Sequence, residues 1–363
     1  MRHKAPRPKY ARFMWIILAI LLLSLLIPGI LLWISSPGKP APFLDDSGKP
    51  LPGSIAEKTF VNIDGTRQGM FIKSKNAQNP VLLFLHGGPG MPTYFLTEKF
   101  PTGLEDHFTV CYWEQTGGGI SANPSLSPAD ITVEKLISDA IKVTHYLRER
   151  FGQDKIYIMG HSWGSFLGIQ TAAAAPELYH AYIGVAQMAR QAESEKLAHR
   201  YMIEQYTKLG NAKMVQKLEQ YDLSESENEL ISYFRSPVRD PAMHQLGIGT
   251  MRDMKSVISG IFLPVMQCRA YTAKEKINLW RAKLRLASET ELIARVLSTD
   301  LTVQAPRLEI PVYFLCGKHD YTVNYDLSKD YLEQIEAPVK GFYTFEHSAH
   351  CPMHEEPERF VKV

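Results

Sequence analysis

Gly160-His-Ser-Trp-Gly164 is the stretch of this chain that decides its fold. It follows an apolar run, Lys155 to Met159, and it precedes a run of small and apolar residues from Ser165 to Ala175. This order predicts a buried strand, a sharp turn that carries the serine, and a helix. Because the turn is strained, its neighbours must be small where strand and helix approach each other. The helix N-terminus would direct partial positive charge at the serine, which favours attack on a carbonyl. An ordinary glycine-rich turn is the alternative.

The size and charge of the chain set the first limits. Its 363 residues are enough for one large α/β domain with an insertion, or for two domains. A net charge of +2 gives no indication of nucleic-acid binding. The four cysteines, at positions 111, 268, 316 and 351, match no metal-binding spacing, and we expect no metal, no disulfide and no organic cofactor.

Residues 13–34 are apolar and uncharged, and 22 residues in a helix extend about 33 Å, enough to cross a bilayer. The preceding segment 1–12 carries five basic residues, whereas Asp45 and Asp46 follow the apolar run. This bias predicts a membrane anchor with a cytoplasmic N-terminus and an extracytoplasmic remainder. A cleaved signal peptide is the competing interpretation, but its apolar core would be shorter. A buried core helix is the third.

The rest of the chain alternates between strand and helix patterns, with one interruption. Residues 35–57 are rich in proline and glycine and read as a linker. Residues 58–186 begin with a predicted hairpin around Asp64-Gly65 and continue as β/α units. Residues 187–305 contain helical patterns without a buried strand, and the β/α rhythm returns in residues 306–363. We therefore predict a mostly parallel, doubly wound sheet split by a helical cap over its ligand-binding edge.

A reactive serine needs a base and an acid that orients the base, and both are expected after the cap. Asp320 follows the predicted strand 311–316 and is the preferred acid, ahead of Asp326 and Asp330 in the next helix. Three histidines, His347, His350 and His354, follow the predicted strand 341–345. His350 is the preferred base, because His347 lies too near the strand end and His354 lies at the start of the next helix. That last helix is short, which favours a truncated C-terminus.

Two glycine-rich loops are predicted at the same edge of the sheet. His86-Gly-Gly-Pro-Gly90 follows the strand 81–85, so its backbone N–H groups can stabilise an oxyanion. Gly88, with Gly87 as the alternative, and Trp163 after the serine are the expected donors. Phosphate binding by this loop is disfavoured, because no phosphate-binding motif follows it. The second loop, residues 114–121, begins with Glu114, which either contacts substrate or braces the loop as a buried acid.

Taken together, these segments resemble the proline iminopeptidase branch of the α/β-hydrolases. The family pattern His-Gly-Gly-Pro-Gly stands intact at 86–90, and the family's Asp-Gln-Arg-Gly-x-Gly-x-Ser reads Glu-Gln-Thr-Gly-Gly-Gly-Ile-Ser at 114–121. The family's Gly-Gly-Ser-Trp-Gly-Ser reads Gly-His-Ser-Trp-Gly-Ser at 160–165, and Asp320 and His350 stand at the family's acid and base positions. Thr116 and His161 are the departures. The cap does not align with the family's cap.

The resemblance implies an α/β-hydrolase fold and a Ser162-His350-Asp320 triad that releases N-terminal residues from small peptides. It also implies cap glutamates that bind the substrate α-amine, without indicating which. The candidates are Glu193, Glu195, Glu204, Glu219, Glu225, Glu227 and Glu229. A carboxylesterase for small acyl esters would use the same triad, and a catalytically silent binding module at the cell surface is a further alternative.

Overall fold

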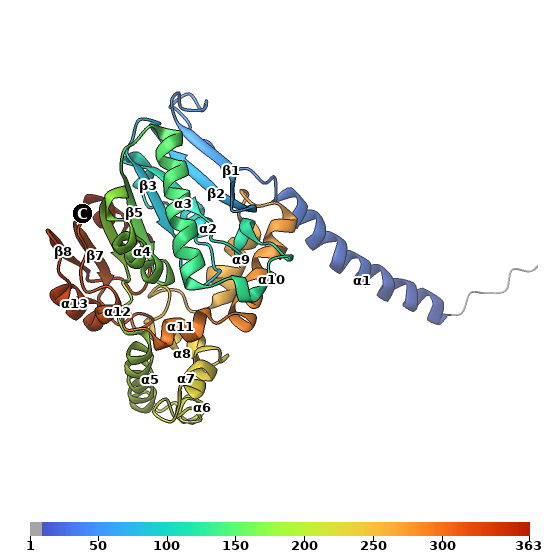
Figure 1. The fold of residues 1–363 in the computed structure, drawn as a ribbon. Helices are drawn as coiled ribbons and strands as arrows, with labels where there is room; N and C mark the ends of the chain where they lie inside the picture. The colour runs from blue at the N-terminus through green and yellow to red at the C-terminus, as the bar shows by residue number, and fades with distance from the viewer. Residues whose placement is uncertain (1–8) are drawn as a thin grey trace, which may run out of the picture.

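The computed structural model describes residues 9–363, which build one eight-stranded sheet with helices on both faces (Figure 1). The strand order is β1-β2-β4-β3-β5-β6-β7-β8. The strands are β1 (Ile55–Ile63), β2 (Thr66–Ser74), β3 (Val81–Leu85), β4 (Thr109–Trp113), β5 (Ile156–His161), β6 (Tyr179–Val185), β7 (Val312–Gly317) and β8 (Lys340–Phe345). β2 pairs antiparallel with β1 and β4, and the other neighbours are parallel. The sheet is therefore mostly parallel, as the sequence predicts.

Helices cover the two faces of the sheet in separate hydrophobic clusters. One face packs against α3 (Val133–Phe151), α4 (Trp163–Ala174) and α13 (Tyr325–Gln334). The other packs against α2 (Tyr94–Lys99), α14 (Pro352–Glu355) and α15 (Pro357–Lys362). Short 3-10 helices occur at Leu104–Asp106, Gly119–Ser121, Pro128–Asp130 and Pro176–Leu178.

Local sequence signals explain several of these elements. Every residue of β3 and β4 is buried, which accounts for their uninterrupted apolar sequence. The β1–β2 hairpin turns at Asp64 and Gly65, whose φ angles of 49° and 77° are those of a type I′ turn. The hairpin predicted from Asp64-Gly65 is thus confirmed. Helix α3 begins after Thr132, whose hydroxyl accepts a hydrogen bond from the Lys135 amide, and ends at Gly152 in the left-handed conformation.

Between β6 and β7 the described chain is helical and forms a cap below the sheet in Figure 1. Part of the cap has its own hydrophobic cluster, which includes Met202, Tyr206 and Tyr233. A π-helical turn at Ile258–Phe262 leads directly into α9. The cap helices are α5 (Gln191–Lys208), α6 (Ala212–Leu218), α7 (Glu227–Phe234), α8 (Arg239–Leu246), α9 (Leu263–Gln267), α10 (Ala273–Glu289), α11 (Leu292–Ser298) and α12 (Leu301–Gln304).

The N-terminal helix α1 (Lys9–Ile34) projects away from the rest of the protein in Figure 1. Its stretch Phe13–Ile34 is long and apolar enough to cross a membrane, and none of it is buried within the protein. Of the basic segment predicted at 1–12, residues 1–8 lie outside the described residues.

The segment that the sequence presents as a linker makes specific contacts with the cap. The Lys276 ammonium donates to the carbonyl oxygens of Ser35 (2.9 Å) and Met266 (2.6 Å). The Gly38 amide donates to the carbonyl of Arg269 at 3.0 Å. Strand β1 begins at Ile55, earlier than the expected start of the folded core at residue 58. Polar contacts therefore hold the residues that directly follow α1 against the cap.

Candidate active site

Ser162 occupies the sharp turn between β5 and α4 that the sequence predicts. Its φ of 57° and ψ of −123° are strained for a residue with a side chain. The flanking glycines make the turn possible. A Cβ on Gly160 would lie 2.2 Å from the carbonyl oxygen of Gly164, and a Cβ on Gly164 would lie 2.0 Å from that of Leu85. The backbone therefore presents the Ser162 side chain at the edge of the sheet.

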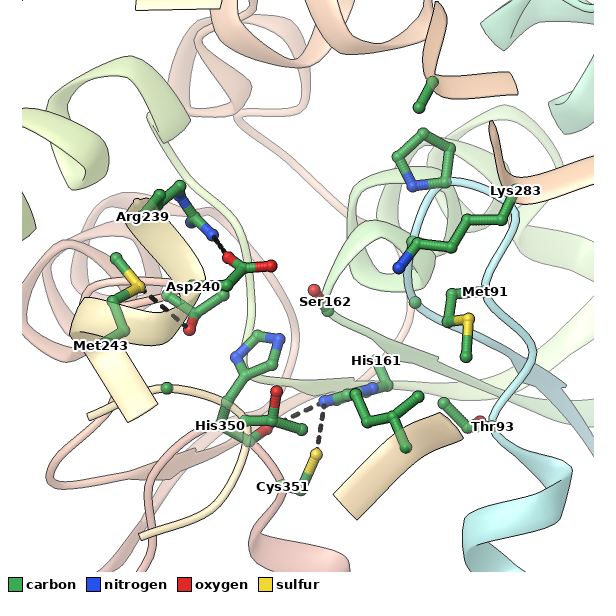
Figure 2. Close-up of a pocket in the computed structure, with 18 of the residues that line it drawn as sticks. Met91, Thr93, His161, Ser162, Arg239, Asp240, Met243, Lys283, His350 and Cys351 are labelled. Atoms are coloured by element: carbon green, nitrogen blue, oxygen red, sulfur yellow. Dashed lines mark hydrogen bonds and ion pairs between the residues drawn. The ribbon is translucent and has the colours of Figure 1, made fainter. Parts of the chain in front are cut away.

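Asp320 and His350 meet although 30 positions separate them. His350 Nδ1 lies 2.8 Å from Asp320 Oδ2, and because a carboxylate only accepts, Nδ1 carries the hydrogen. The other carboxylate oxygen, Oδ1, accepts from the amides of Thr322 (2.9 Å) and Val323 (3.0 Å). Figure 2 shows the His350 ring turned toward Ser162, and both residues line one cavity. Because His350 Nδ1 is bound to Asp320, Nε2 is the ring nitrogen that remains for interaction with Ser162.

The three C-terminal histidines have different environments. His347 is exposed, and its backbone amide donates to Glu356 Oε2 at 3.0 Å. His354 is buried with Nδ1 3.0 Å from the carbonyl oxygen of Phe100, and burial lowers its pKa to about 4. Glu355 accepts from the Ala349 amide at 2.9 Å and so braces the loop that carries His350. Of the three, only His350 lines the cavity with Ser162 in the described chain.

The loop after β3 lies beside the serine. Gly87 and Gly88 line the cavity, and a Cβ on Gly87 would lie 3.4 Å from Ser162 Cβ. Gly88 has a φ of 129°, and a Cβ there would lie 2.5 Å from the Gly90 amide nitrogen. Trp163 is the first residue of α4, so its amide has no acceptor within the helix. The loop after β3 and the first turn of α4 therefore both lie beside Ser162.

Gln115 joins the three sequence motifs, a role that was not predicted from the sequence. Its side-chain amide donates to the carbonyl of His86 at 2.9 Å and accepts from the Trp163 indole at 2.8 Å. Its backbone amide donates to His86 Nε2 at 3.1 Å, and burial lowers the pKa of His86 to about 4, so that this ring stays neutral and can accept. Gln115 thus fixes the His86 loop relative to the turn at Ser162. Its place in the second motif was the available signal.

Glu114 braces its own loop and does not line the cavity that holds Ser162. Its Oε2 accepts from the Ile120 amide at 2.6 Å, and its Oε1 accepts from the Tyr271 hydroxyl. The carboxyl is buried, and desolvation raises its pKa to about 8. Of the two roles expected for Glu114, the contacts fit that of a buried acid that holds the loop.

This buried carboxyl predicts a pH-dependent stability. Since its pKa is raised from 4.5 to about 8 on folding, its contribution is fully present below pH about 4.5 and is lost as the pH rises through about 8. Glu114→Gln removes the titration. We expect the wild-type unfolding free energy to fall by about 4 kcal/mol relative to the variant between pH 5 and pH 9. Thermal unfolding of the detergent-solubilised chain across this range measures the difference, and parallel curves would contradict the assignment.

The two departures from the family pattern are also accounted for. Thr116 donates to the buried Asp139 carboxylate at 2.5 Å. His161 Nε2 lies 2.9 Å from the carbonyl oxygen of His350, and its ring centroid is 4.8 Å from that of His350. Burial holds the pKa of His161 well below its usual value, so the neutral ring donates from Nε2. His161 therefore ties the end of β5 to the loop of His350.

The cavity above Ser162 has a volume of about 310 Å³ and lies between the sheet edge and the cap. In the described range 9–363, Asp240 is the only carboxylate that lines it, and Arg235, Arg239 and Lys283 are the cations. The candidate cap glutamates do not line it within this range. Glu195 is buried behind the cavity, where its carboxylate binds the lining residue Arg239 through two hydrogen bonds of 2.7 and 2.5 Å.

A serine in a strained strand-to-helix turn, at the edge of a mostly parallel sheet and below a helical cap, defines a hydrolase of the α/β class. The chain belongs to the alpha/beta hydrolase fold family, whose sequence model matches residues 80–357. It is proline iminopeptidase-like, as the resemblance at the motifs predicts.

Individual relatives agree with this placement. "Probable aminopeptidase YbaC" of Bacillus subtilis is 30% identical over 325 residues, covering 85% of this chain and 95% of the relative. A proline iminopeptidase of Saccharolobus solfataricus is 24% identical over 298 residues, covering 78% and 83%. The crystal structure of a Mycobacterium smegmatis proline iminopeptidase superposes with a TM-score of 0.61 at 17% identity, covering 85% and 96%.

Proposed function

We propose that this hydrolase is a serine aminopeptidase of the proline iminopeptidase type, which releases N-terminal residues from short peptides. The observation that carries the proposal is that Ser162 and His350 line one cavity and that His350 is paired with Asp320 behind it. The names of its relatives support a peptide substrate.

In the proposed mechanism, Ser162 Oγ attacks the scissile carbonyl carbon while His350 Nε2 removes the hydroxyl proton. Asp320 holds the imidazole through Nδ1 and stabilises the imidazolium that forms. The amides of Gly88 and Trp163 donate to the oxyanion, with Gly87 beside them. His350 then protonates the leaving amine, and an acyl-enzyme remains on Ser162. Water, deprotonated by the same histidine, hydrolyses the acyl-enzyme and restores the serine.

We assign substrate amine recognition to Asp240 rather than to one of the cap glutamates. Its side chain is 56% exposed within the structure and borders the cavity, and Figure 2 shows it directed toward the space beside Ser162. Although the side chain is more than half exposed, the surrounding cavity wall partly desolvates the carboxylate, which opposes ionisation. The Arg239 guanidinium, 2.6 Å away, outweighs this and lowers the pKa of Asp240. An ionised carboxylate at this place favours a peptide N-terminus over an uncharged ester.

Two substrates and one substitution test this assignment. We expect wild type to cleave proline β-naphthylamide with a higher kcat/KM than p-nitrophenyl acetate. We expect Asp240→Asn to lower kcat/KM for the amide at least tenfold more than for the ester, because only the amide carries an ammonium group. Preference for the ester, with equal effects of the substitution on both, would favour a carboxylesterase.

We further propose that α1 is an uncleaved anchor that leaves the catalytic domain outside the cytoplasm. The length and exposed apolar surface of α1 support membrane insertion. The basic residues before the apolar run, and the acidic pair Asp45 and Asp46 after it, support the orientation.

A further inference from the structure

Lys283 is a cation of the cavity that has no ion-pair partner within residues 9–363. It lies on α10, it is half-buried, and Figure 2 shows its ammonium directed toward the space above Ser162. Within residues 9–363 it makes no ion pair and no hydrogen bond, and its nearest aromatic ring, that of Trp280, is centred 5.6 Å from Nζ.

Lys276 and Arg285 on α10, and Arg239 in the cavity, do have polar partners. On α10, Lys276 binds two carbonyl oxygens, and Arg285 donates to the carbonyls of Asn123 (3.1 Å) and Leu126. In the cavity, Arg239 is neutralised by Glu195 and Asp240. Arg235 is exposed at the end of α7. A half-buried ammonium without a partner is the arrangement that an anionic ligand group would complete.

Charge is divided between the two sides of the serine. In Figure 2, Asp240 and Lys283 lie on opposite sides of Ser162, and both side chains reach toward the space between them. A dipeptide carries an ammonium and a carboxylate on either side of one peptide bond, about 7 Å apart at roughly 3.5 Å per residue. A cavity of about 310 Å³ is at the lower end of ligand sites, which suits a ligand of two residues.

We propose that Lys283 binds the free α-carboxylate of the substrate and selects dipeptides over longer or C-terminally blocked peptides. The proposal rests on the aminopeptidase function proposed above, with Asp240 at the amino end of the substrate. With both ends held, the single peptide bond lies over Ser162. A longer peptide would place a neutral amide beside the Lys283 ammonium. An uncharged ester would place no anionic group there.

The test compares L-prolyl-L-alanine with its C-terminal amide on the full-length protein in detergent. We expect wild type to prefer the free acid about tenfold in kcat/KM, mainly through KM. Lys283→Met keeps the length and apolar stem of the side chain, and we expect it to lower kcat/KM about tenfold more for the free acid than for the amide. Lys274→Met, an exposed lysine of the same helix, is the matched control and should retain the wild-type preference.

The outcomes separate the two proposals. If wild type cleaves proline β-naphthylamide but treats acid and amide alike, the carboxylate site is wrong and the aminopeptidase stands. The carboxylate site is also wrong if Lys283→Met lowers kcat/KM equally for the free acid and for the amide, because loss of cap packing would have that effect. If neither dipeptide nor the naphthylamide is cleaved while p-nitrophenyl acetate is, both proposals are overturned.

Discussion

Ser162→Ala is expected to lower kcat by about 10⁴- to 10⁶-fold, because it removes the hydroxyl that we propose as the nucleophile that forms the acyl-enzyme. The fold should be retained. Alanine meets the same backbone demand as serine at a φ of 57°, and Ser162 Oγ forms no hydrogen bond within the described chain that the substitution would break. Hydrolysis of proline β-naphthylamide, with labelling by a fluorophosphonate probe, measures the effect. The probe should label wild type and leave the variant unlabelled.

Ser165 provides a matched control three residues further along the chain. Its hydroxyl is buried, donates to the Ser162 carbonyl at 2.6 Å and accepts from the Met188 amide at 2.9 Å, but it does not line the cavity. Ser165→Ala should therefore cost stability more than chemistry, and the probe should still label the protein. If Ser162→Ala keeps more than about a tenth of the wild-type activity, another residue is the nucleophile.

Much of the fold was predictable from local sequence because its signals are local. A strand buried on both faces must be apolar throughout, and β3 and β4 show this directly. The turn at Ser162 needs glycine on both sides because backbone from neighbouring elements leaves no room for a Cβ. The Asp64-Gly65 turn is equally local, since both residues adopt positive φ. In each case a short segment carries the whole constraint.

The charge arrangement of the cavity was not predictable, because distant contacts decide it. In the sequence, Glu195 is one of seven similar cap glutamates. Only its ion pair with Arg239, 44 positions away, distinguishes it from the others. Glu114 had two roles that fitted its sequence equally, and Tyr271, 157 positions away, distinguishes them. Asp240 and Lys283 have no motif around them. Which helix face meets the cavity depends on how the cap packs, and no local pattern in the sequence records that.

The second large effect is expected at His350 and not at its neighbour His347. His350→Ala should lower kcat/KM by about 10⁴-fold or more, because it removes the group that we propose as the base for the Ser162 proton and leaves Asp320 without its partner. His347→Ala should remain within about twofold of wild type. Its side chain is exposed, and the contact it makes with Glu356 uses the backbone amide, which alanine keeps.

The pair is informative because both histidines lie in the loop that follows β8. A general disturbance of that loop would affect both variants, whereas loss of a base affects one. Rates for the two variants should be measured on proline β-naphthylamide and on p-nitrophenyl acetate, since the same base serves amide and ester. A reversed ranking would assign the base to His347 and require the loop to move. Equal, small losses would show that neither histidine removes the proton, and the pairing of His350 with Asp320 would then be structural.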